Sequence, residues 1–342
     1  MHHFCTYFDG RFVLRALALH RSLCRHVPRF TLHALCFDDE AYDFVAALND
    51  PTFRPIALRE LESALPALRQ AKVNRNPVEY YFTCTPALPL YLLDQDRDIP
   101  AVTYLDADLY FFGDPTPIFA ELGTGSVAII SHRYPPHLKH FECYGRFNVG
   151  WLTFRNDAPG RACLQRWHEQ CLEWCYEQVE ETRFADQKYL DAWPRNHAGV
   201  VELQHPGANL APWNIANYTL EHRDGRVHVD GRPLVFFHFH RLKPVRPYLY
   251  DPGLKHYGAS ADATVIRRIY APYLRELRDL AGLYPRVQSG NPRLAAMHDR
   301  GLLRTLIYGH TLLHLGPIAT EVHLEPFARP LLWLRERTKR AA

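Results

Sequence analysis

Several features that mark membrane, secreted or nucleic-acid-binding proteins are missing from this sequence of 342 residues. No apolar run reaches the roughly 18 residues that a membrane span needs. The first residues also lack the charged-then-apolar order of a signal peptide. The formal net charge is only +3, which gives no electrostatic indication of a nucleic-acid binder. We therefore expect a cytoplasmic protein without a nucleic-acid partner.

Two common metal-site patterns are missing as well. The eight cysteines include no Cys-x-x-Cys pair, and the twenty histidines include no His-Glu-x-x-His pattern. We interpret the cysteines as reduced residues of the core. The composition is 47% hydrophobic and 13% aromatic, so the chain can bury a large core.

Strand and helix patterns alternate at the start of the chain. Residues 3–8 read as a buried strand, residues 12–27 show helical spacing of apolar side chains, and residues 31–37 read as a second strand. This order predicts a βαβ unit and a mostly parallel sheet. A helix is predicted near 79–94, interrupted by Pro86 and Pro89. Further strands are predicted at 101–112, 126–131, 146–155 and 234–239.

Two aspartates interrupt the apolar run from 101 to 112. Asp106 and Asp108 are two residues apart, so on a strand they point to the same side. Close carboxylates repel each other unless a cation or hydrogen-bond donors offset the repulsion, and hard divalent cations take carboxylate oxygens. Read alone, the pair is a weak motif, and a strand that runs into a solvent-exposed turn explains it better than a metal site does.

The segments around these aspartates form an ordered set that is known from one family. Tyr104-Leu105-Asp106-Ala107-Asp108 resembles the metal-binding motif of GT-A fold glycosyltransferases, especially the glycogenin-like and bacterial lipopolysaccharide galactosyltransferase group. The other matching segments are Thr6–Asp9, Phe147–Gly150, Asp186-Gln187, Trp213-Asn214 and His238-Phe239 with Lys243. The resemblance covers about 4–250. Residues 74–86 and 209–214 also look like a lesser-studied bacterial branch with this fold.

The resemblance implies a fold and a division of the chain. The fold is α/β: a GT-A, Rossmann-like sheet that is twisted and mostly parallel, with helices on both faces. We predict a catalytic domain over 1–260 and a helical, basic C-terminal appendage over 261–342. The basic and aromatic stretch at 329–340 either makes a peripheral contact with the inner membrane surface or docks as an ordinary terminal helix.

The resemblance also implies the residues of an active site. Asp106, Asp108 and a histidine hold Mn²⁺ or Mg²⁺, and the choice between His238 and His240 stays open. The sugar, the acceptor and the leaving diphosphate are contacted by Asn148, Asp186, Gln187 and Lys243. Beside the two aspartates, the nucleotide is bordered by Thr6, Tyr7, Asp9, Arg75, Ala107 and Gly150.

After the histidine strand the chain departs from the group's pattern. The group has a glycine three residues after the histidine and a lysine six residues after it. Here Arg241 stands at the place of the glycine, and Lys243 follows His238 by five residues. This leaves open whether Arg241 contacts phosphate.

The predicted activity is the transfer of a hexose from a nucleoside diphosphate-sugar to a hydroxyl of a glycan, lipid-linked or other acceptor. A UDP-sugar is the first candidate for the donor. The resemblance implies retention of the anomeric configuration, whereas an inverting enzyme needs a carboxylate base such as Asp186 or Glu79. The alternatives are a sugar-nucleotide nucleotidyltransferase, a non-catalytic sugar-nucleotide or glycan-binding protein, and a metal-dependent hydrolase. Asp9-Gly10-Arg11 is shorter than the Gly-rich loop expected of a nucleotidyltransferase.

Overall fold

Residues 1–246, 249–284, 312–315 and 322–325 are described by a computed structural model of the chain. The chain divides into two compact units. The first contains residues 1–210 and 232–238, and the second contains the rest. The predicted boundary at 260, between a catalytic domain and an appendage, is a different division and stays a prediction. None of the helices in the described ranges has the length and apolar character needed to cross a bilayer.

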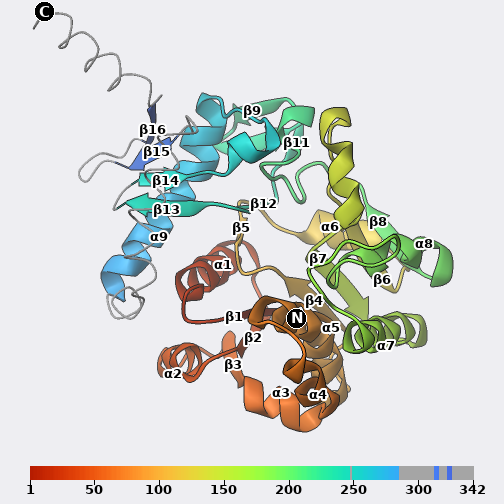
Figure 1. Ribbon diagram of the computed structural model, residues 1–342. Coiled ribbons are helices and arrows are strands. Elements are labelled where there is room, and N and C mark those ends of the chain that lie inside the picture. The colour runs from red at the N-terminus through yellow and green to blue at the C-terminus, as the bar shows by residue number, and fades with distance from the viewer. Residues whose placement is uncertain (247–248, 285–311, 316–321, 326–342) are drawn as a thin grey trace, which may run out of the picture. The chain divides into compact units, whose positions relative to one another are not determined.

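A seven-stranded sheet organises the first unit (Figure 1). Its strands are β1 (His2–Phe8), β2 (Phe30–Cys36), β3 (Phe53–Ala57), β4 (Ala101–Leu105), β6 (Val127–Ser131), β7 (Phe147–Arg155) and β8 (Val200–Leu203). They lie in the order β3-β2-β1-β4-β7-β6-β8. Within this sheet β7 alone runs antiparallel to its neighbours. The predicted βαβ unit and mostly parallel sheet are confirmed.

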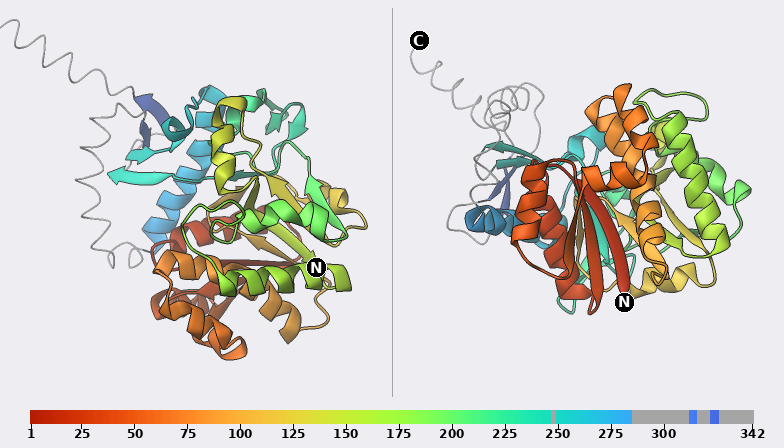
Figure 2. Two further views of the ribbon diagram at one scale, coloured as in Figure 1. Left: turned by 45° about the vertical axis from the view of Figure 1, so that its right-hand side comes forward. Right: turned by 90° about the horizontal axis from the view of Figure 1, so that it is seen from below.

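Helices cover both faces of this sheet (Figure 2). The α-helices of the unit are α1 (Val13–His26), α2 (Asp39–Ala47), α3 (Leu58–Ala64), α4 (Ala67–Val73), α5 (Pro77–Gln95), α6 (Thr116–Leu122), α7 (Ala158–Glu173) and α8 (Trp193–Asn196). The 3₁₀ helices are η1 (Pro136–Tyr144) and η2 (Lys188–Ala192). One face buries Cys84 and Trp167 against the strands. On the other face, the rings of Phe4 and Phe119 pack against Trp151.

The helix near 79–94 is not interrupted, contrary to the prediction. α5 continues through Pro86 and Pro89, which are both buried. Its start is fixed by Asn76, whose side chain accepts from the backbone N–H groups of Val78 and Glu79. The packing of this apolar helix in the core compensates for the hydrogen bonds that proline cannot make.

The strand predicted over 101–112 is two strands with a turn between them. β4 ends at Leu105, the N–H of Leu109 donates to the carbonyl of Asp106 at 3.1 Å, and β5 (Leu109–Phe111) follows. β5 leaves the large sheet and pairs antiparallel with β12 (Phe236–His238), so that Leu109 lies opposite His238. This two-stranded ribbon brings a histidine to the two aspartates. A short strand, β11 (Arg232–Pro233), precedes β12.

The second unit contains short antiparallel strands and helices. β9 (Leu220–Arg223) pairs with β10 (Arg226–Val229). A further sheet has the order β13 (Lys243–Arg246), β14 (Leu249–Asp251), β15 (Leu312–Leu315) and β16 (Val322–Glu325). The helices are η3 (Ile215–Asn217), η4 (Leu254–Tyr257), η5 (Val265–Tyr270) and α9 (Ala271–Leu283). The basic stretch at 329–340 lies outside the described residues.

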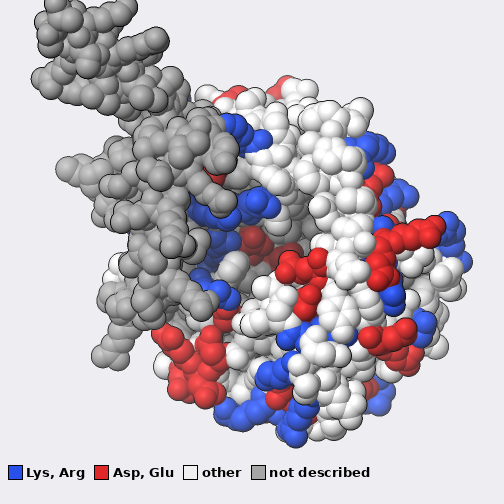
Figure 3. All heavy atoms as spheres, viewed as in Figure 1, with Lys and Arg blue, Asp and Glu red and all other residues white. Residues whose placement is uncertain are grey.

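Charged side chains of both signs are mixed over the described surface of the face drawn in Figure 3. Lys and Arg side chains lie among Asp and Glu side chains on this face. The mixture agrees with the small formal net charge of +3. Any strongly charged site on the described part of this face is therefore a local arrangement of a few side chains.

Candidate active site

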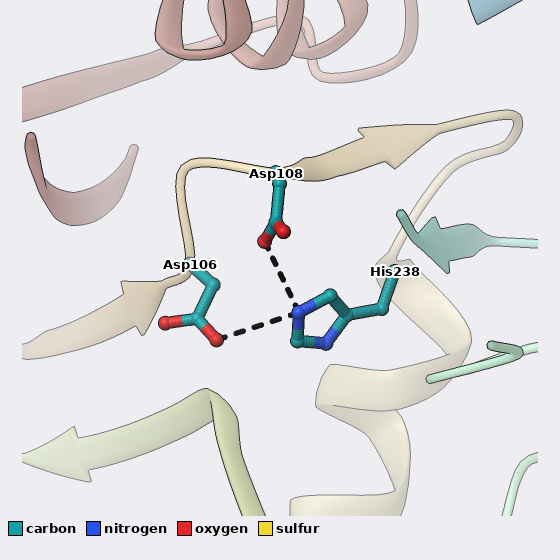
Figure 4. A group of neighbouring side chains, drawn as sticks. All are labelled: Asp106, Asp108 and His238. Carbon is teal, nitrogen blue, oxygen red and sulfur yellow. Dashed lines mark ion pairs between the residues drawn. The ribbon is translucent and has the colours of Figure 1, made fainter. Parts of the chain in front are cut away.

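Asp106, Asp108 and His238 point toward one another in the first unit (Figure 4). Nε2 of His238 lies 3.1 Å from Oδ1 of Asp108 and 3.6 Å from Oδ2 of Asp106. Each residue offers one ligand atom, and these atoms lie within 4.8 Å of one another. Carboxylate oxygens and an imidazole nitrogen are suitable donors for a divalent cation, so the three residues fit a metal site.

The backbone places these carboxylates at one edge of the sheet. β1, β2 and β4 are parallel, so Asp9 and Asp106, which follow β1 and β4, lie at the same edge. β7 runs in the opposite direction and begins at this edge with Phe147 and Asn148. The N–H of Asp106 donates to the carbonyl of Gly150 at 3.1 Å. Ligands of open α/β sheets bind at this carboxyl edge.

The charges of the Asp–Asp–His group depend on one another. Burial alone would lower the pKa of His238, but the carboxylates of Asp108 and Asp106 outweigh it and raise the pKa. Burial raises the pKa of Asp106, and His238 opposes this shift. The side chain of Asp106 is still 29% exposed. A cation from solvent can therefore reach this carboxylate and relieve the repulsion between the two aspartates.

Arg15 is a neighbour of this group that the sequence analysis missed. Its Nη1 lies 3.7 Å from Oδ2 of Asp108, and its guanidinium group lies over the ring of Phe12 at 4.6 Å. It comes from the first turn of α1, far from the aspartates in sequence. Its position depends on the packing of α1 and β5, which no local pattern reveals.

Gly150 packs directly against the imidazole ring of His238. A Cβ atom at position 150 would lie 2.6 Å from Oδ1 of Asn148 and 3.0 Å from two ring atoms of His238. Only glycine therefore leaves the histidine ring in its place. This is a packing reason for the glycine, and the predicted approach of the nucleotide to Gly150 stays a prediction.

Asn148 is buried and joins Gly150 to His132. Its Oδ1 accepts from the N–H of Gly150 at 3.2 Å, and its Nδ2 lies 3.4 Å from Nε2 of His132. Nδ1 of His132 lies 3.1 Å from the carbonyl of Arg146, which assigns the ring proton to Nδ1. Burial lowers the pKa of His132 to about 3, so the ring is neutral. The predicted contact of Asn148 with sugar stays a prediction.

Asp186 is a buried carboxyl group beside the metal-site residues. Asp186 is only 4% exposed to solvent. Burial raises the pKa of Asp186 to about 7; a hydrogen bond with Thr85 opposes the shift, and the charge of Asp106 adds to it. No ion pair joins Asp186 to a cationic side chain among the residues that the structure describes. Asp186 therefore holds a proton over much of the range below neutral pH.

The backbone around Asp186 is strained and fixed. Ala185 has a φ of +46°, a region that side chains other than glycine rarely adopt. The carbonyl of Asp186 accepts from Nε1 of Trp167 at 2.8 Å. Gln187 donates from Nε2 to the carbonyl of Tyr144 at 3.0 Å and precedes the short helix η2. The predicted sugar and acceptor contacts of Asp186 and Gln187 stay predictions.

A row of hydroxyl groups lies between Asp106 and Asp186. The hydroxyl of Tyr104 donates to Oδ1 of Asp106 at 2.9 Å. The ring of Tyr104 lies 5.5 Å from the ring of Tyr7, whose hydroxyl accepts from Thr85 at 3.3 Å. Tyr7 was predicted only as a nucleotide contact, which stays a prediction, and the contacts of Tyr104 and Thr85 were not predicted. Their alignment requires α5 to be docked on β1 and β4.

Asp9 directly follows β1, and its carboxylate accepts hydrogen bonds from two neighbouring side chains. Its Oδ2 accepts from Nε of Arg11 at 2.8 Å and from the hydroxyl of Tyr81 at 3.4 Å. The ring of Tyr81 stacks on Phe37 at 3.9 Å. Thr6 is fully buried, and its hydroxyl has no hydrogen-bond partner within the described chain. The predicted nucleotide contacts of Asp9 and Thr6 stay predictions.

Arg75 and Glu79 flank the start of α5 and contact the segment after α7. The guanidinium group of Arg75 lies 4.0 Å from the ring centre of Tyr176. Glu79 accepts from the N–H of Asn76 at 2.9 Å and from the N–H of Glu177 at 3.1 Å. A helix cap thus accounts for Glu79, whereas Asp186 is a carboxyl group on which the charge of Asp106 acts. The nucleotide contact of Arg75 stays a prediction.

His240 and Lys243 belong to the second unit. The ring of His240 lies 5.4 Å from Trp213 and 6.3 Å from Tyr257. Lys243 is exposed at the start of β13. The structure thus places His238 with the two aspartates in the first unit. The metal role of His240 and the diphosphate role of Lys243 stay predictions.

Comparisons with known proteins agree with this architecture. No family model matches the chain. The galactosyltransferase LgtC, solved in complex with donor and acceptor sugar analogs, has a TM-score of 0.51 at 17% identity; the match covers 81% of this chain and 95% of LgtC. An active-site mutant of LgtC has a TM-score of 0.52 at 17% identity, and the match covers 82% of this chain and 95% of the mutant. Both matches show the fold, which is GT-A.

Two sequence relatives cover most of the chain. The uncharacterized protein YfnD of Bacillus subtilis (strain 168) is 33% identical over 279 residues, which are 81% of this chain and 88% of YfnD. YfnF of the same organism is 32% identical over 244 residues, which are 69% of this chain and 80% of YfnF. Sequence identity of this level over this share of the chain shows that the proteins are members of one family. The chain therefore belongs to the family of YfnD and YfnF.

Proposed function

We propose that the chain is a metal-dependent glycosyltransferase that moves a hexose from a nucleoside diphosphate-sugar to an acceptor hydroxyl. The observation that carries this proposal is the group of Asp106, Asp108 and His238 at the carboxyl edge of a GT-A sheet. The structural neighbour LgtC is a galactosyltransferase that binds donor and acceptor sugar analogs, which supports sugar transfer here.

The proposed cation is Mn²⁺ ahead of Mg²⁺. Mg²⁺ prefers oxygen ligands only, whereas the nitrogen of His238 suits a transition metal better. When bound, the cation neutralises the negative charge that grows on the leaving diphosphate. The chain's own residues hold this site: Tyr104 orients Asp106 through a hydrogen bond, and Gly150 leaves room for the histidine ring.

The other proposed roles follow the carboxyl edge of the sheet. UDP is the first candidate for the nucleotide, which we place beside Thr6, Tyr7, Asp9, Arg75, Ala107 and Gly150. The sugar, acceptor and diphosphate are assigned to Asn148, Asp186, Gln187 and Lys243. A cytoplasmic location is part of the proposal, and for residues 329–340 a membrane contact and an ordinary terminal helix both stay open.

We propose retention of the anomeric configuration, which the resemblance to the glycogenin-like group supports. The inverting alternative would use Asp186 as the base that takes the proton of the acceptor hydroxyl. Glu79 is bound at the cap of α5. Proton NMR of the first product, recorded before mutarotation, distinguishes the two outcomes: the donor's anomeric configuration supports retention, and the opposite configuration assigns Asp186 as the base.

A nucleotidyltransferase is disfavoured by the loop after β1. Only residues 9–12 separate β1 from α1, and within them Asp9 is bound by Arg11. A loop this short does not surround a triphosphate as a Gly-rich loop does. Release of pyrophosphate from a nucleoside triphosphate and a sugar phosphate would overturn glycosyl transfer as the activity.

The first test is thermal unfolding of the full chain with UDP, GDP, dTDP and CMP, each with Mn²⁺ or with EDTA. A ligand at 100 times its Kd adds about 2.7 kcal/mol of stability. We expect a shift with one nucleotide that requires Mn²⁺ and that Asp106→Asn abolishes. Asp43→Asn removes an exposed carboxylate on α2 and is the matched control. No shift with any nucleotide would contradict the proposed donor site.

A further inference from the structure

His20 and Cys24 lie one turn apart on α1. Residues four apart on a helix share one face, and Sγ of Cys24 lies 3.6 Å from Nε2 of His20. The imidazole ring stacks on the ring of Phe53, with the ring centres 4.7 Å apart, and the ring centre of Phe30 lies 5.8 Å away. His20 is buried, so this packing fixes the direction in which its nitrogen points.

The segment before β3 brings a hydroxyl and a carboxylate to the same nitrogen. Oγ1 of Thr52 lies 2.9 Å from Nε2 of His20, and Oδ2 of Asp50 lies 3.7 Å from it. The other carboxylate oxygen of Asp50 accepts hydrogen bonds from the N–H and the hydroxyl of Thr52, at 2.8 Å and 2.6 Å. These two bonds hold Asp50 beside the helix. A thiol, a hydroxyl and a carboxylate therefore face one imidazole nitrogen.

Three polar partners are more than one neutral imidazole nitrogen can serve, since it carries either one proton or one lone pair. A cation bound between them would serve all of them, and thiolate, imidazole and carboxylate are ligands of Zn²⁺. In a tetrahedral site with Zn–S of about 2.3 Å and Zn–N of about 2.0–2.1 Å, sulfur and nitrogen lie roughly 3.6 Å apart. The distance between Cys24 and His20 agrees with this value.

Solvent reaches two of these three ligands. Cys24 is exposed, and the side chain of Asp50 is 38% exposed, against 7% for His20. The two distances given above both run to His20, whereas in the candidate active site all ligand atoms lie within 4.8 Å of one another. A rotation of the Cys24 or Asp50 side chain therefore completes the set when a cation enters, and water can supply a fourth ligand.

The thiol of Cys24 is a poor candidate for a free nucleophile. Burial raises its pKa, and the charge of Asp50 raises it further, although a hydrogen bond with Thr52 opposes the shift. Without a cation the thiol therefore keeps its proton at neutral pH. Zn²⁺ deprotonates a thiol that coordinates it, and the proton passes to solvent. The arrangement thus suits metal binding better than reaction of the free thiol.

We propose that His20, Cys24 and Asp50 form a zinc site in the first unit, which shares no residue with the candidate active site. The bound ion links α1 to the segment before β3 and so stabilises the folded chain. A soft thiolate and an imidazole select Zn²⁺ over Mg²⁺, which prefers oxygen ligands. The zinc site does not depend on the proposed function.

The test titrates the full chain with Co²⁺ as a spectroscopic substitute for Zn²⁺, after removal of metal with EDTA, dialysis and reduction of the thiols. Co²⁺ bound to a thiolate shows a near-ultraviolet charge-transfer absorption that carboxylate and imidazole ligands do not give. We expect this absorption in the wild type, its loss when Zn²⁺ is added, and no effect of Mg²⁺. Cys24→Ser should abolish it. His20→Gln and Asp50→Asn should each weaken Co²⁺ binding at this site at least tenfold.

The matched control is Cys143→Ser. Cys143, on η1, is the other exposed cysteine among the eight, so this variant removes an accessible thiol elsewhere and should keep the absorption. Asp106→Asn should keep it as well, because the candidate active site contains no thiol. In the Asp106→Asn protein, Zn²⁺ should raise the temperature of unfolding, and adding Cys24→Ser should remove that rise. Without metal, Cys24→Ser should unfold at the wild-type temperature.

The outcomes distinguish this site from other metal binding. A wild-type chain without the thiolate absorption in Co²⁺ would overturn the zinc site. The same conclusion would follow from absorption that persists in Cys24→Ser and disappears in Cys143→Ser. Absorption that requires Cys24, with unchanged Co²⁺ affinity in both His20→Gln and Asp50→Asn, would contradict the proposed ligand set. None of these results depends on whether a nucleotide binds.

Discussion

Asp106 and Asp186 are two aspartates of the same unit whose surroundings differ. Asp106 lies 3.6 Å from Nε2 of His238 and accepts a hydrogen bond from Tyr104. Asp186 has a hydroxyl neighbour, Thr85, and no ion pair to a described cation. Burial raises the pKa of both residues, and for Asp186 the value reaches about 7.

The difference indicates two kinds of chemistry within one site. Asp106 and Asp108 share an imidazole and keep contact with solvent, so a cation can join them. Asp186 is buried without an ion pair to a described cation, and its hydrogen bonds offset only part of the effect of burial, so it holds a proton that ionised carboxylates lack. A neutral carboxylic acid can donate a hydrogen bond to a sugar or acceptor oxygen. The candidate metal-binding carboxylate Asp106 and the proton-bearing Asp186 thus both act electrostatically on Tyr7.

The largest expected effect is the loss of activity in Asp106→Asn. An amide is a poor ligand for the cation and removes one of the two charges that attract it, so kcat/KM should fall about 1,000-fold or more. Steady-state transfer or donor hydrolysis in Mn²⁺ measures this change. Asp43→Asn, an exposed control on α2, should keep wild-type kinetics. Equal kcat/KM in both variants would break the distinction between Asp106 and an ordinary surface carboxylate.

The next effect is on the pH dependence of stability in Asp186→Asn. With a folded pKa of about 7 against an ordinary value of 3.8, the folded state keeps a proton that the unfolded chain loses. Wild-type stability from this group therefore falls as pH rises from the ordinary value of 3.8 to about 7 and levels off above the folded pKa. Asparagine does not ionise. The free energy of unfolding of the variant, relative to that of the wild type, should therefore rise by about 3 kcal/mol between pH 5 and pH 8.

Urea unfolding of both proteins at several pH values measures that gain. The comparison uses the change in the free energy of unfolding with pH. Any pH-independent effect of replacing the carboxyl group by an amide therefore cancels. Parallel stability curves would show that Asp186 is ionised at pH 5 and would remove its contrast with Asp106.

Part of this comparison could be predicted from local sequence. Asp106 and Asp108 interrupt an apolar run, and this local signal singled out the two carboxylates, but the turn that separates β4 from β5 was not predicted. His238 follows them by more than a hundred residues, and it reaches them only because β12 pairs with β5. Sequence spacing could not decide between His238 and His240, since the choice depends on that pairing register.

The groups around Asp186 were harder to predict. Thr85 sits on α5, where the two prolines indicated an interruption that the packed helix does not have. Arg15 falls within the helix predicted over 12–27, where no local pattern singles it out, yet it lies 3.7 Å from Asp108. Such contacts depend on how helices dock on the sheet, which the period of apolar residues does not determine.

A smaller effect is expected for Gly150→Ala. The added Cβ atom would press on the ring of His238 and on Asn148, so overpacking should destabilise the fold by about 1–3 kcal/mol and weaken Mn²⁺ binding several-fold. Gly282→Ala places a methyl group in open space on α9 and should be neutral or stabilising. Unchanged Mn²⁺ affinity in Gly150→Ala would show that the position of His238 does not set the metal site.

The smallest effect should separate the two aspartates most finely. Tyr104→Phe removes the hydrogen bond to Asp106 but no contact made by Asp186. A hydrogen bond of this kind contributes about 0.5–1.5 kcal/mol, so Mn²⁺ affinity should fall about three- to tenfold. The pH dependence that Asp186 confers should change little. Tyr80→Phe is the matched control, since this buried tyrosine bonds to Glu62, away from the metal-site residues. Equal Mn²⁺ affinities in the two variants would mean that Tyr104 fills space and does not orient Asp106.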